Sequence, residues 1–272
     1  MKSFAYDAGY YETGIGGFHR ASFPIISSVF DKYFRSQGFD CILDFGCGAG
    51  FWGQFLSNHC RRLMGVDFSD ILPSTISRPL YYEFSQIDLG RSWESIVKYD
   101  LVFSIEVIEH VEDCEVFLAN AFNALKPGGF LFLTTTTYFW TLFVLLIVYR
   151  RQTTLTALWE FLAGLLGNER KRRAFVSRFW EYFAGHYHGF TRSQLRRLAL
   201  NVGFRDIQIE NLHIQPVVPV NYLDQPYTGS HPGTVAAVVP LIRIIGNAIN
   251  WLCRSLDIYA PNVLLIARRP IE

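Results

Sequence analysis

The chain has 272 residues and a mass of 31.3 kDa, and its formal net charge is +1 at pH 7. Half of its residues are hydrophobic and 18% are charged, which excludes intrinsic disorder because a disordered chain needs low hydrophobicity and high net charge. The balanced charge also argues against binding nucleic acid over a broad face, since such a face takes many uncompensated cations.

Short β-rich runs alternate with helical stretches along the chain, a pattern typical of a parallel sheet covered by helices on both faces. The sequence predicts helices over 23–37, 53–60 and 112–125, with a further helix from Thr191, and strands over 41–45, 62–67, 81–86, 99–104, 130–135, 203–211 and 262–268. Lys126–Gly129 is predicted to be a turn. We therefore expect an α/β fold, a Rossmann-like doubly wound sheet of about seven strands, as a single domain over 1–272.

Two segments depart from this alternation. The first, 138–184, is predicted to be a helical insertion or lid; it begins apolar and then carries seven cations against three anions. The second, 235–256, is predicted to be an additional apolar helix, with its polar residues on one narrow stripe. The insertion suits either a packed cap with a solvated basic face or a lid for a lipid-like acceptor whose anionic head group meets the cations. The second apolar helix favours the lid. We expect peripheral membrane contact that salt weakens.

No membrane-spanning helix is expected. The uncharged run 130–149 is long enough to cross a bilayer, but four threonines at 134–137 divide it into a strand and a segment too short to span. The N-terminus has no apolar signal-peptide region, and the five cysteines show no CxxC spacing. Scattered thiols suit a reducing compartment, so we expect a cytoplasmic protein, with a position at the inner face of a membrane as the alternative.

A glycine loop follows the first predicted strand in the run LDFGCGAG. Gly46, Gly48 and Gly50 have the spacing GxGxG, whereas the dinucleotide fingerprint GxGxxG would need a glycine at Phe51. The chain also lacks the GK[ST] of a P-loop. The loop therefore suits a ligand without phosphate, and an NAD-dependent oxidoreductase is disfavoured.

Two carboxylates follow the next predicted strands. Asp67 ends the second strand and is placed to accept hydrogen bonds from ribose hydroxyls, and Asp88 follows the third strand and could accept from the amine of an adenine ring. The alternative for both residues is a turn-capping aspartate. A ligand with ribose and adenine but without phosphate indicates S-adenosylmethionine.

The runs LDFGCGAG, GVDFS, YDLVFSIEVIEHVED and LKPGGFLFLTT occur in an order that resembles the class I S-adenosylmethionine-dependent methyltransferases. The resemblance covers residues 25–137, and 185–211 more loosely. It implies methyl transfer to a small hydrophobic or lipid-linked acceptor, with O-methylation favoured; the alternative is a cofactor-binding protein without catalysis. The cofactor-binding residues predicted in this way are Asp44, Phe45, Gly46, Cys47, Gly48, Gly50, Asp67, Phe68, Asp88, Leu89, Ile105 and Glu106.

Glu106, Glu109 and His110 have the spacing i, i+3, i+4, so on a helical turn they could face one point and bind a divalent cation. The segment is similar to that of the O-methyltransferases of ubiquinone synthesis, in which the matching residues are metal ligands. The alternative is a structural turn.

His186 and His188 precede a predicted helix, and either imidazole is a candidate general base for a hydroxyl acceptor; the alternative is that they form structural hydrogen bonds.

Overall fold

A computed structural model of the protein describes residues 16–69, 83–140, 155–177, 186–214, 239–257 and 259–271. The chain divides into two compact units. The first unit comprises Met1–Thr135, Arg192–Glu210 and Leu264–Glu272, and the second comprises Thr136–Thr191 and Asn211–Val263. Residues 141–154 and 178–184 of the predicted insertion lie outside the described residues.

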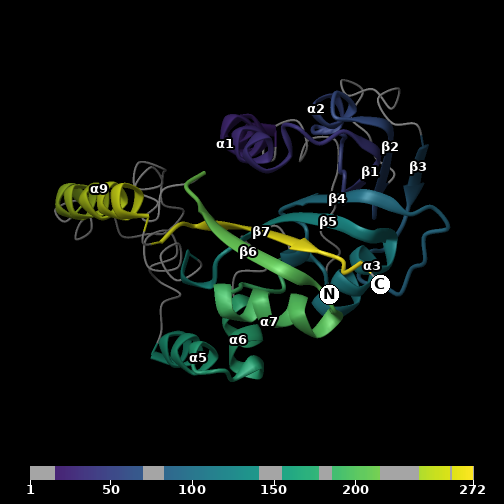
Figure 1. The fold of residues 1–272 in the computed structure, drawn as a ribbon. Helices are drawn as coiled ribbons and strands as arrows, with labels where there is room; N and C mark the ends of the chain where they lie inside the picture. Colours follow the sequence, from purple (N-terminus) through teal and green to yellow (C-terminus); the bar gives the residue numbers. More distant parts are fainter. Residues whose placement is uncertain are drawn as a thin grey trace. The chain divides into compact units, whose positions relative to one another are not determined.

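The first unit is built on a twisted sheet with the strand order β3-β2-β1-β4-β5-β7-β6 (Figure 1). The strands are β1 (Phe39–Phe45), β2 (Cys60–Asp67), β3 (Glu83–Gln86), β4 (Tyr99–Ile105), β5 (Leu125–Thr136), β6 (Arg205–Leu212) and β7 (Asn262–Arg268). The first five run parallel to their neighbours. β7 is antiparallel to β5, because Gly128 N–H donates to Arg269 O while Thr137 N–H donates to Pro261 O. The prediction of a doubly wound α/β sheet of seven strands is confirmed.

Helices cover both faces of this sheet. Asp44 pairs with Phe103 in the register of β1 and β4, so these two side chains point to one face and Phe45 points to the other. Phe30 of α1 (Gly16–Phe34) packs against Phe103 with ring centroids 6.1 Å apart, and Phe117 of α3 (Cys114–Ala124) packs against Phe45 at 4.8 Å. Aromatic contacts from two helices therefore hold β1 and β4, the strands from which the glycine loop and Glu106 emerge.

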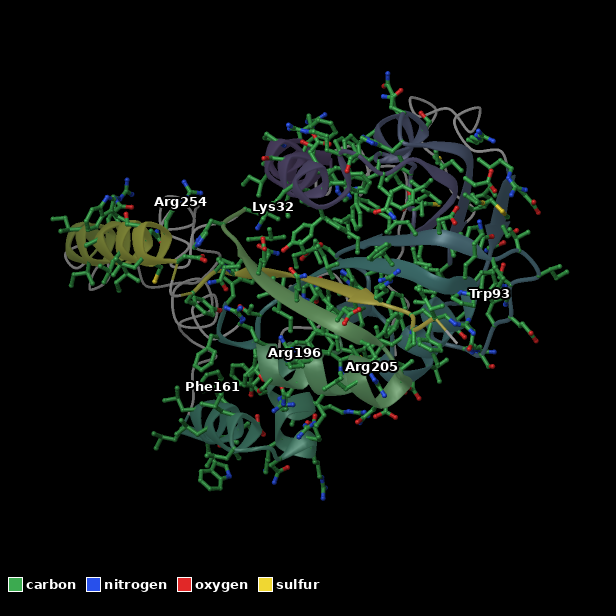
Figure 2. All side chains as sticks on the ribbon, in the orientation of Figure 1. Lys32, Trp93, Phe161, Arg196, Arg205 and Arg254 are labelled. Atoms are coloured by element: carbon green, nitrogen blue, oxygen red, sulfur yellow. The ribbon has the colours of Figure 1, made fainter. Side chains whose placement is uncertain are left out.

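The ends of α1 and α3 are held by polar contacts. Lys32, labelled in Figure 2, forms an ion pair with Glu210 of β6 at 2.6 Å. At the start of α3, the side chain of Asp113 accepts from the backbone amides of Glu115 and Val116 at 3.0 and 3.1 Å. This N-cap satisfies two amides that the helix leaves without an internal partner, and it explains why α3 begins at Cys114, after the predicted residue 112.

The predicted turn at Lys126–Gly129 is wrong, because these residues belong to β5. Tyr99 pairs with Leu125 but Leu101 pairs with Phe130, so β5 has extra residues at this point and forms a bulge. Gly128 has a φ of 81°, and the bulge is held by Gly128 N–H donating to Arg269 O and by Arg269 N–H donating to Gly129 O, each at 2.9 Å. Proline and two glycines do bend the backbone here, as predicted. Pairing with β7, which the local sequence does not indicate, makes these residues part of a strand.

Two helix lengths also differ from prediction. α1 begins at Gly16, seven residues before the predicted start at residue 23, and it contains Pro24, although a proline inside a helix removes one backbone hydrogen bond. α2 covers only Gly53–Ser57, because Cys60 already pairs with Phe39 as the first residue of β2. In both cases contacts with distant parts of the chain override the local preference.

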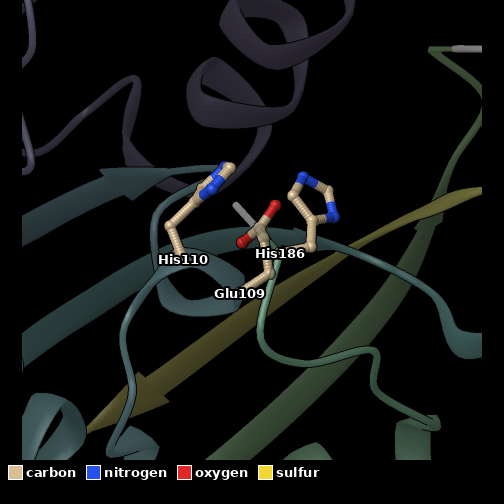
Figure 3. A group of neighbouring side chains, drawn as sticks. All are labelled: Glu109, His110 and His186. Carbon is tan, nitrogen blue, oxygen red and sulfur yellow. The ribbon is translucent and has the colours of Figure 1, made fainter. Parts of the chain in front are cut away.

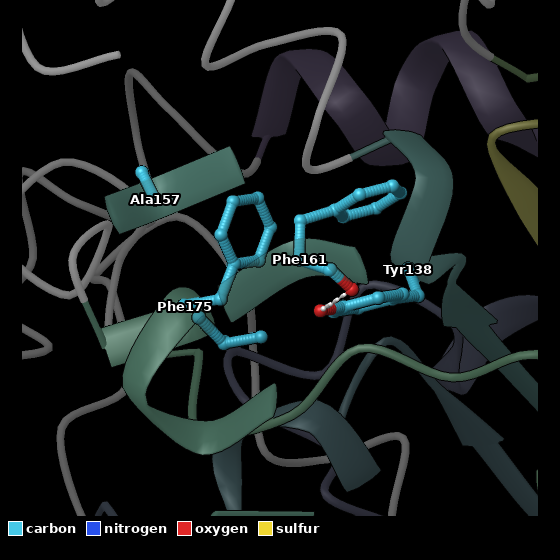
Figure 4. Close-up of a cluster of buried hydrophobic side chains, with 5 residues drawn as sticks. Tyr138, Ala157, Phe161 and Phe175 are labelled. Atoms are coloured by element: carbon cyan, nitrogen blue, oxygen red, sulfur yellow. Dashed lines mark hydrogen bonds between the residues drawn. The ribbon is translucent and has the colours of Figure 1, made fainter. Parts of the chain in front are cut away.

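The second unit has its own hydrophobic core, built on α5 (Leu155–Leu165) and α6 (Glu169–Ser177). Tyr138, Ala157, Phe161, Phe175 and Val176 are all buried in it (Figure 4). The Tyr138 hydroxyl donates to Phe161 O at 3.2 Å. The described part of the predicted insertion is therefore helical and packs as a unit.

A long helix, α9 (Val239–Leu256), also belongs to the second unit. At its end Arg254 donates to His213 O at 2.8 Å, and His213 pairs with Asp257 at 2.9 Å. The predicted helix over 235–256 is present from Val239 onward, and residues 235–238 lie outside the described residues. Among the helices that the structure describes, none combines the length and the hydropathy that crossing a membrane requires.

Candidate functional site

The glycine loop leaves β1 in a left-handed backbone conformation. Gly46, Gly48 and Gly50 have φ values of 87°, 51° and 80°, a region that residues with a Cβ rarely adopt. The amide of Gly46 donates to Val66 O of β2 at 2.8 Å. A Cβ at Gly46 would lie 2.7 Å from Cγ1 of Val107. The loop therefore needs glycine at Gly46 for its backbone conformation and for its packing.

Asp67, at the end of β2, holds this loop in place. Its carboxylate accepts from Gly48 N–H and from Ser69 N–H, both at 2.8 Å. Burial raises the pKa of the Asp67 carboxyl above its ordinary value, and the hydrogen bonds from these backbone amides oppose that shift. The turn-capping alternative is thus realised at Asp67. A carboxylate has about four acceptor positions, so the two amides leave capacity for the ribose hydroxyls expected from the sequence.

The charge around the loop favours a cationic ligand over a phosphate. Asp44 is 2% exposed at the end of β1, and Asp67 lies at the end of the neighbouring strand. The chain carries no lysine or arginine between residues 44 and 52, and the Gly48 amide already donates to Asp67. A pyrophosphate needs free amides and positive charge. The residues present therefore fit a sulfonium cofactor better than a dinucleotide.

The other residues predicted to bind the cofactor lie at the carboxyl ends of strands in the same unit. Phe45 ends β1, Ile105 ends β4 and Phe68 follows β2, and these three strands are parallel neighbours. Phe68 is exposed, whereas Cys47 and Leu89 are buried. Carboxyl ends of parallel strands form the usual ligand crevice of open α/β sheets. The structure brings these residues to one edge, and their contact with a cofactor stays a prediction.

The loop after β3 is organised around two side chains. Asp88 is exposed; its carboxylate accepts from Gly90 N–H at 3.1 Å and pairs with Arg91 at 3.0 Å. Asn120 of α3, which is 3% exposed, accepts from Trp93 N–H at 3.0 Å and donates to Leu89 O and Arg91 O at 3.2 and 2.7 Å. Asp88 thus caps a turn, and its proposed contact with adenine depends on a loop that Asn120 fixes. The sequence did not indicate this role for Asn120, because no local pattern shows that an asparagine in a helix bonds the backbone of a distant loop. We call this set of three hydrogen bonds the Asn120 clamp.

Replacing Asn120 with alanine is expected to lower the free energy of unfolding by about 3 kcal/mol, because buried backbone groups lose three hydrogen bonds. The loop that carries Asp88 and Leu89 would loosen, and we expect the affinity for S-adenosylhomocysteine to fall about tenfold. Denaturant unfolding and titration calorimetry measure the two effects. Asn123→Ala, an exposed position on the same helix, is the matched control, and equal behaviour of the two variants would contradict the clamp.

Glu106, Glu109 and His110 do not share the helical turn on which their predicted spacing was based, and this part of the prediction is wrong. Only Ile108–His110 is helical, as a 3-10 turn, and Glu106 before it has a left-handed φ of 55°. Figure 3 shows Glu109 and His110 on this turn; His186, drawn with them, belongs to the second unit. Among the described residues, no group of three ligand-type side chains within 4.8 Å of one another contains Glu106.

Glu109 is fully buried, and its Oε2 accepts from Thr135 Oγ1 at 2.9 Å. Its Oε1 has no hydrogen-bond partner in the described part of the chain, so one oxygen keeps the capacity to bind a ligand. Metal ligation by Glu106, Glu109 and His110 stays a prediction. The strained backbone of Glu106, a non-glycine residue with positive φ, is typical of a functional position and supports the proposed role of Glu106 beside the cofactor.

His19 of α1 contacts the end of the glycine loop, a contact that the sequence did not indicate. Its Nδ1 accepts from the indole N–H of Trp52 at 3.2 Å, and its ring stacks on Phe51 with centroids 5.0 Å apart. Burial lowers the pKa of His19 to about 4. The imidazole is therefore neutral at pH 7, as its role as acceptor requires, and it ties α1 to the two residues that follow Gly50.

Because the pKa of His19 is about 4 in the folded state against about 6.5 for a free imidazole, acid favours the unfolded state. We expect stability to be unaffected by this group well above pH 6.5 and to fall by about 3 kcal/mol as the pH drops to 4. Thermal melts of His19→Gln, which keeps an acceptor for Trp52 but does not titrate, should lack this component. Parallel pH profiles for the two proteins would contradict it.

His186 and His188, the candidate bases, lie in the second unit on a short segment that is neither helix nor strand. The His188 ring stacks on Phe190 with centroids 5.8 Å apart. Phe190 O accepts from Tyr138 N–H at 2.9 Å, and Thr137 and Phe190 form a parallel bridge. The segment is thus bonded to the chain that continues β5. Both imidazoles are half-buried, and their catalytic role stays a prediction.

Comparison with known proteins gives one family match. A family model described as a methyltransferase domain matches residues 19–209. The ubiquinone biosynthesis O-methyltransferase of Hydrogenovibrio crunogenus is 32% identical to this chain over 114 residues, which are 39% of this chain and 46% of that protein. The match therefore spans less than half the length of the curated relative.

Solved structures resemble the chain in fold. Haemonchus contortus phosphoethanolamine N-methyltransferase 2, solved with S-adenosyl-L-methionine, has a TM-score of 0.58 at 15% identity, covering 99% of this chain and 61% of that one. The cyclase SpnF has a TM-score of 0.54 at 14% identity, covering 91% and 82%. At such identities the likeness shows the fold alone, and a cyclase among the similar structures means that the fold does not settle the reaction.

Proposed function

Because this chain belongs to the methyltransferase domain family, we propose that it is an enzyme that transfers a methyl group from S-adenosylmethionine to a small acceptor. The observation that carries the proposal is the glycine loop. Its three glycines are left-handed, its Gly48 amide donates to the half-buried Asp67, and Asp67 and the buried Asp44 offer carboxylates where a dinucleotide would need cations. Loop and charge together support a sulfonium nucleoside as the cofactor.

The cofactor supplies an activated methyl group on a sulfonium, so the protein needs no nucleophile of its own. The residues of the protein bind the cofactor and orient it toward the acceptor. Asp67 would accept from the ribose hydroxyls, Asp88 and Leu89 would hold the adenine, and the glycine loop would leave room for the methionine part because its glycines lack Cβ atoms. Asp44 and Glu106 would supply negative charge to a sulfonium cation. The chain's contribution to rate is then alignment of donor and acceptor in a site that excludes water.

The acceptor that we propose is hydrophobic or lipid-linked, with oxygen as the methylated atom. The similarity to a ubiquinone biosynthesis O-methyltransferase supports it, over part of the chain, and so does the apolar first part of the insertion over 138–184. A cytoplasmic location, with peripheral contact at a membrane face, belongs to the same proposal. The alternative, a cofactor-binding protein without methyl transfer, is kept because SpnF shares the fold and its name describes a cyclase.

The test is incubation of the full chain with S-adenosylmethionine carrying a labelled methyl group and with a lipid extract, followed by mass spectrometry of labelled products. We expect label in an apolar, oxygen-bearing compound. Tight binding of S-adenosylhomocysteine in titration calorimetry without labelled product from lipid or aqueous extracts would favour the non-catalytic alternative. Binding of NAD in place of the sulfonium cofactor would reject the proposal.

His186→Ala and His188→Ala test the proposed base. If either imidazole takes the proton of a hydroxyl acceptor, its removal is expected to lower kcat about a hundredfold and to leave the affinity for S-adenosylhomocysteine unchanged. His213→Ala is a matched control, because His213 pairs with Asp257 in the same unit. Turnover of both variants at the wild-type rate would remove catalysis from these histidines and leave structural hydrogen bonding as their role.

A further inference from the structure

An exposed apolar stripe runs along α5. Leu155, Trp159, Leu162 and Leu166 are spaced four, three and four residues apart, so they lie on one side of the helix. Trp159 is 60% exposed and Leu166 is 87% exposed. The opposite side of α5 is buried, where Phe161 packs against Phe175 of α6 with ring centroids 5.3 Å apart. The core of the unit therefore turns this stripe outward.

The adjoining helix α6 is strongly basic. Arg170, Lys171 and Arg173 lie on its accessible surface, whereas Arg172 is buried beneath them. Arg172 pairs with Glu169, the one acidic residue in the sequence of α6, at 2.6 Å. The guanidinium of Arg172 also lies over the Tyr138 ring, 5.3 Å from its centroid. The only carboxylate in α6 is thus engaged by the buried arginine, and the three surface cations give the helix an uncompensated positive charge.

A second helix of the same unit has the same character. α9 exposes Trp251, which is 69% exposed, along with Ile244, Ile245, Leu252 and Leu256. The charged residues in its sequence are Arg243 and Arg254, and it contains no acidic residue. Aliphatic side chains, one tryptophan and cations without acids are the composition of helices that lie in the plane of a membrane interface.

We propose that α5 and α6 form a docking surface for an anionic phospholipid bilayer, with the apolar stripe entering the boundary between head groups and acyl chains and the cations contacting lipid phosphates. The inference rests on the proposed function in one respect, that a lipid-linked acceptor would be reached at that surface. A bilayer fits better than a protein partner, because tryptophan and leucine beside several Lys and Arg residues are typical of helices at a membrane interface. The exposed carboxylate of Glu169 is paired with Arg172, so the net charge of the surface stays positive.

The test is co-sedimentation of the full chain with phosphatidylcholine vesicles, with and without phosphatidylglycerol. We expect binding to the anionic vesicles at low ionic strength and its loss at about 1 M salt, where charges are screened beyond roughly 3 Å. Arg170→Gln with Arg173→Gln should weaken binding about twentyfold. Trp159→Ser with Leu162→Ser should weaken it about tenfold. The matched control is Ile96→Ser, which removes an aliphatic side chain that is 99% exposed in the first unit and should change nothing.

Three results would overturn the proposal. They are equal binding of the wild-type protein to neutral and anionic vesicles, no vesicle binding at low salt, and a loss of vesicle binding in Ile96→Ser as large as that in the variants of α5 and α6. Concentration-dependent self-association that Trp159→Ser with Leu162→Ser abolishes would assign the surface to a protein contact and would also overturn it. Calorimetry with S-adenosylhomocysteine on the same proteins separates the two proposals. Vesicle binding can fail while cofactor binding persists, and the proposed methyl transfer would then stand.

Discussion

Replacing Gly46 with alanine is expected to lower the free energy of unfolding by about 2–5 kcal/mol and to abolish measurable binding of S-adenosylhomocysteine. The φ of Gly46 is 87°, and a residue with a Cβ pays about 1–2 kcal/mol for a left-handed backbone. The new Cβ would also lie 2.7 Å from Cγ1 of Val107, a β-branched side chain with little rotamer freedom, and such overpacking costs about 1–3 kcal/mol. The loop must then move away from the ligand.

Two variants make this prediction specific. Gly38→Ala is the matched control, because a Cβ there has no neighbour within 4 Å, and it should be neutral for both stability and binding. Adding Val107→Ala to Gly46→Ala removes the steric overlap but not the left-handed φ, so we expect stability to recover only in part. Full recovery would assign the whole effect to packing. Wild-type affinity in Gly46→Ala would contradict the role of the loop.

Asp67→Asn is expected to weaken S-adenosylhomocysteine binding about a hundredfold and to cost about 2 kcal/mol of stability. Asp67 accepts from two backbone amides, Gly48 N–H and Ser69 N–H. An asparagine offers one acceptor oxygen and turns its amide toward the other N–H, which leaves a half-buried donor without this partner. Calorimetry and denaturant unfolding measure the two effects. Asp40→Asn, at an exposed carboxylate that pairs with Arg62, should change stability by less than about 1 kcal/mol.

The pH dependence of Asp67 gives a second measurement. Burial raises the pKa of this carboxyl in the folded protein, so the folded state takes up the proton more readily than the unfolded state. On acidification below that raised pKa, the contribution of Asp67 to stability should increase, while ligand affinity should fall because the protonated group is a poorer acceptor. In Asp67→Asn both dependences should be absent. Affinity that rises on acidification in the wild-type protein would contradict the assignment.

Several features were predictable because local residue patterns determine them. Alternating apolar strands and helices predicted the sheet, and β7 covers the predicted residues without an error at either end. The GxGxG spacing marked Gly46, Gly48 and Gly50, and their left-handed φ values follow from the absence of a Cβ. Asp67 was identified as the carboxylate that ends a strand beside this loop. In each case the residues of a short segment are enough to indicate its backbone conformation or its chemistry.

Other features depended on partners far away in the chain. Lys126–Gly129 joined β5 because β7 pairs with it there. Asn120 became a clamp, and His19 a neutral acceptor, only through contacts with residues 27 and 33 positions away. The expected turn of Glu106, Glu109 and His110 failed because Glu106 took a left-handed φ beside Thr134 O. By itself the sequence determined the strands, the glycine loop and its acid. The tertiary structure decided which polar groups are buried together, because burial and hydrogen bonding depend on neighbours that no local pattern specifies.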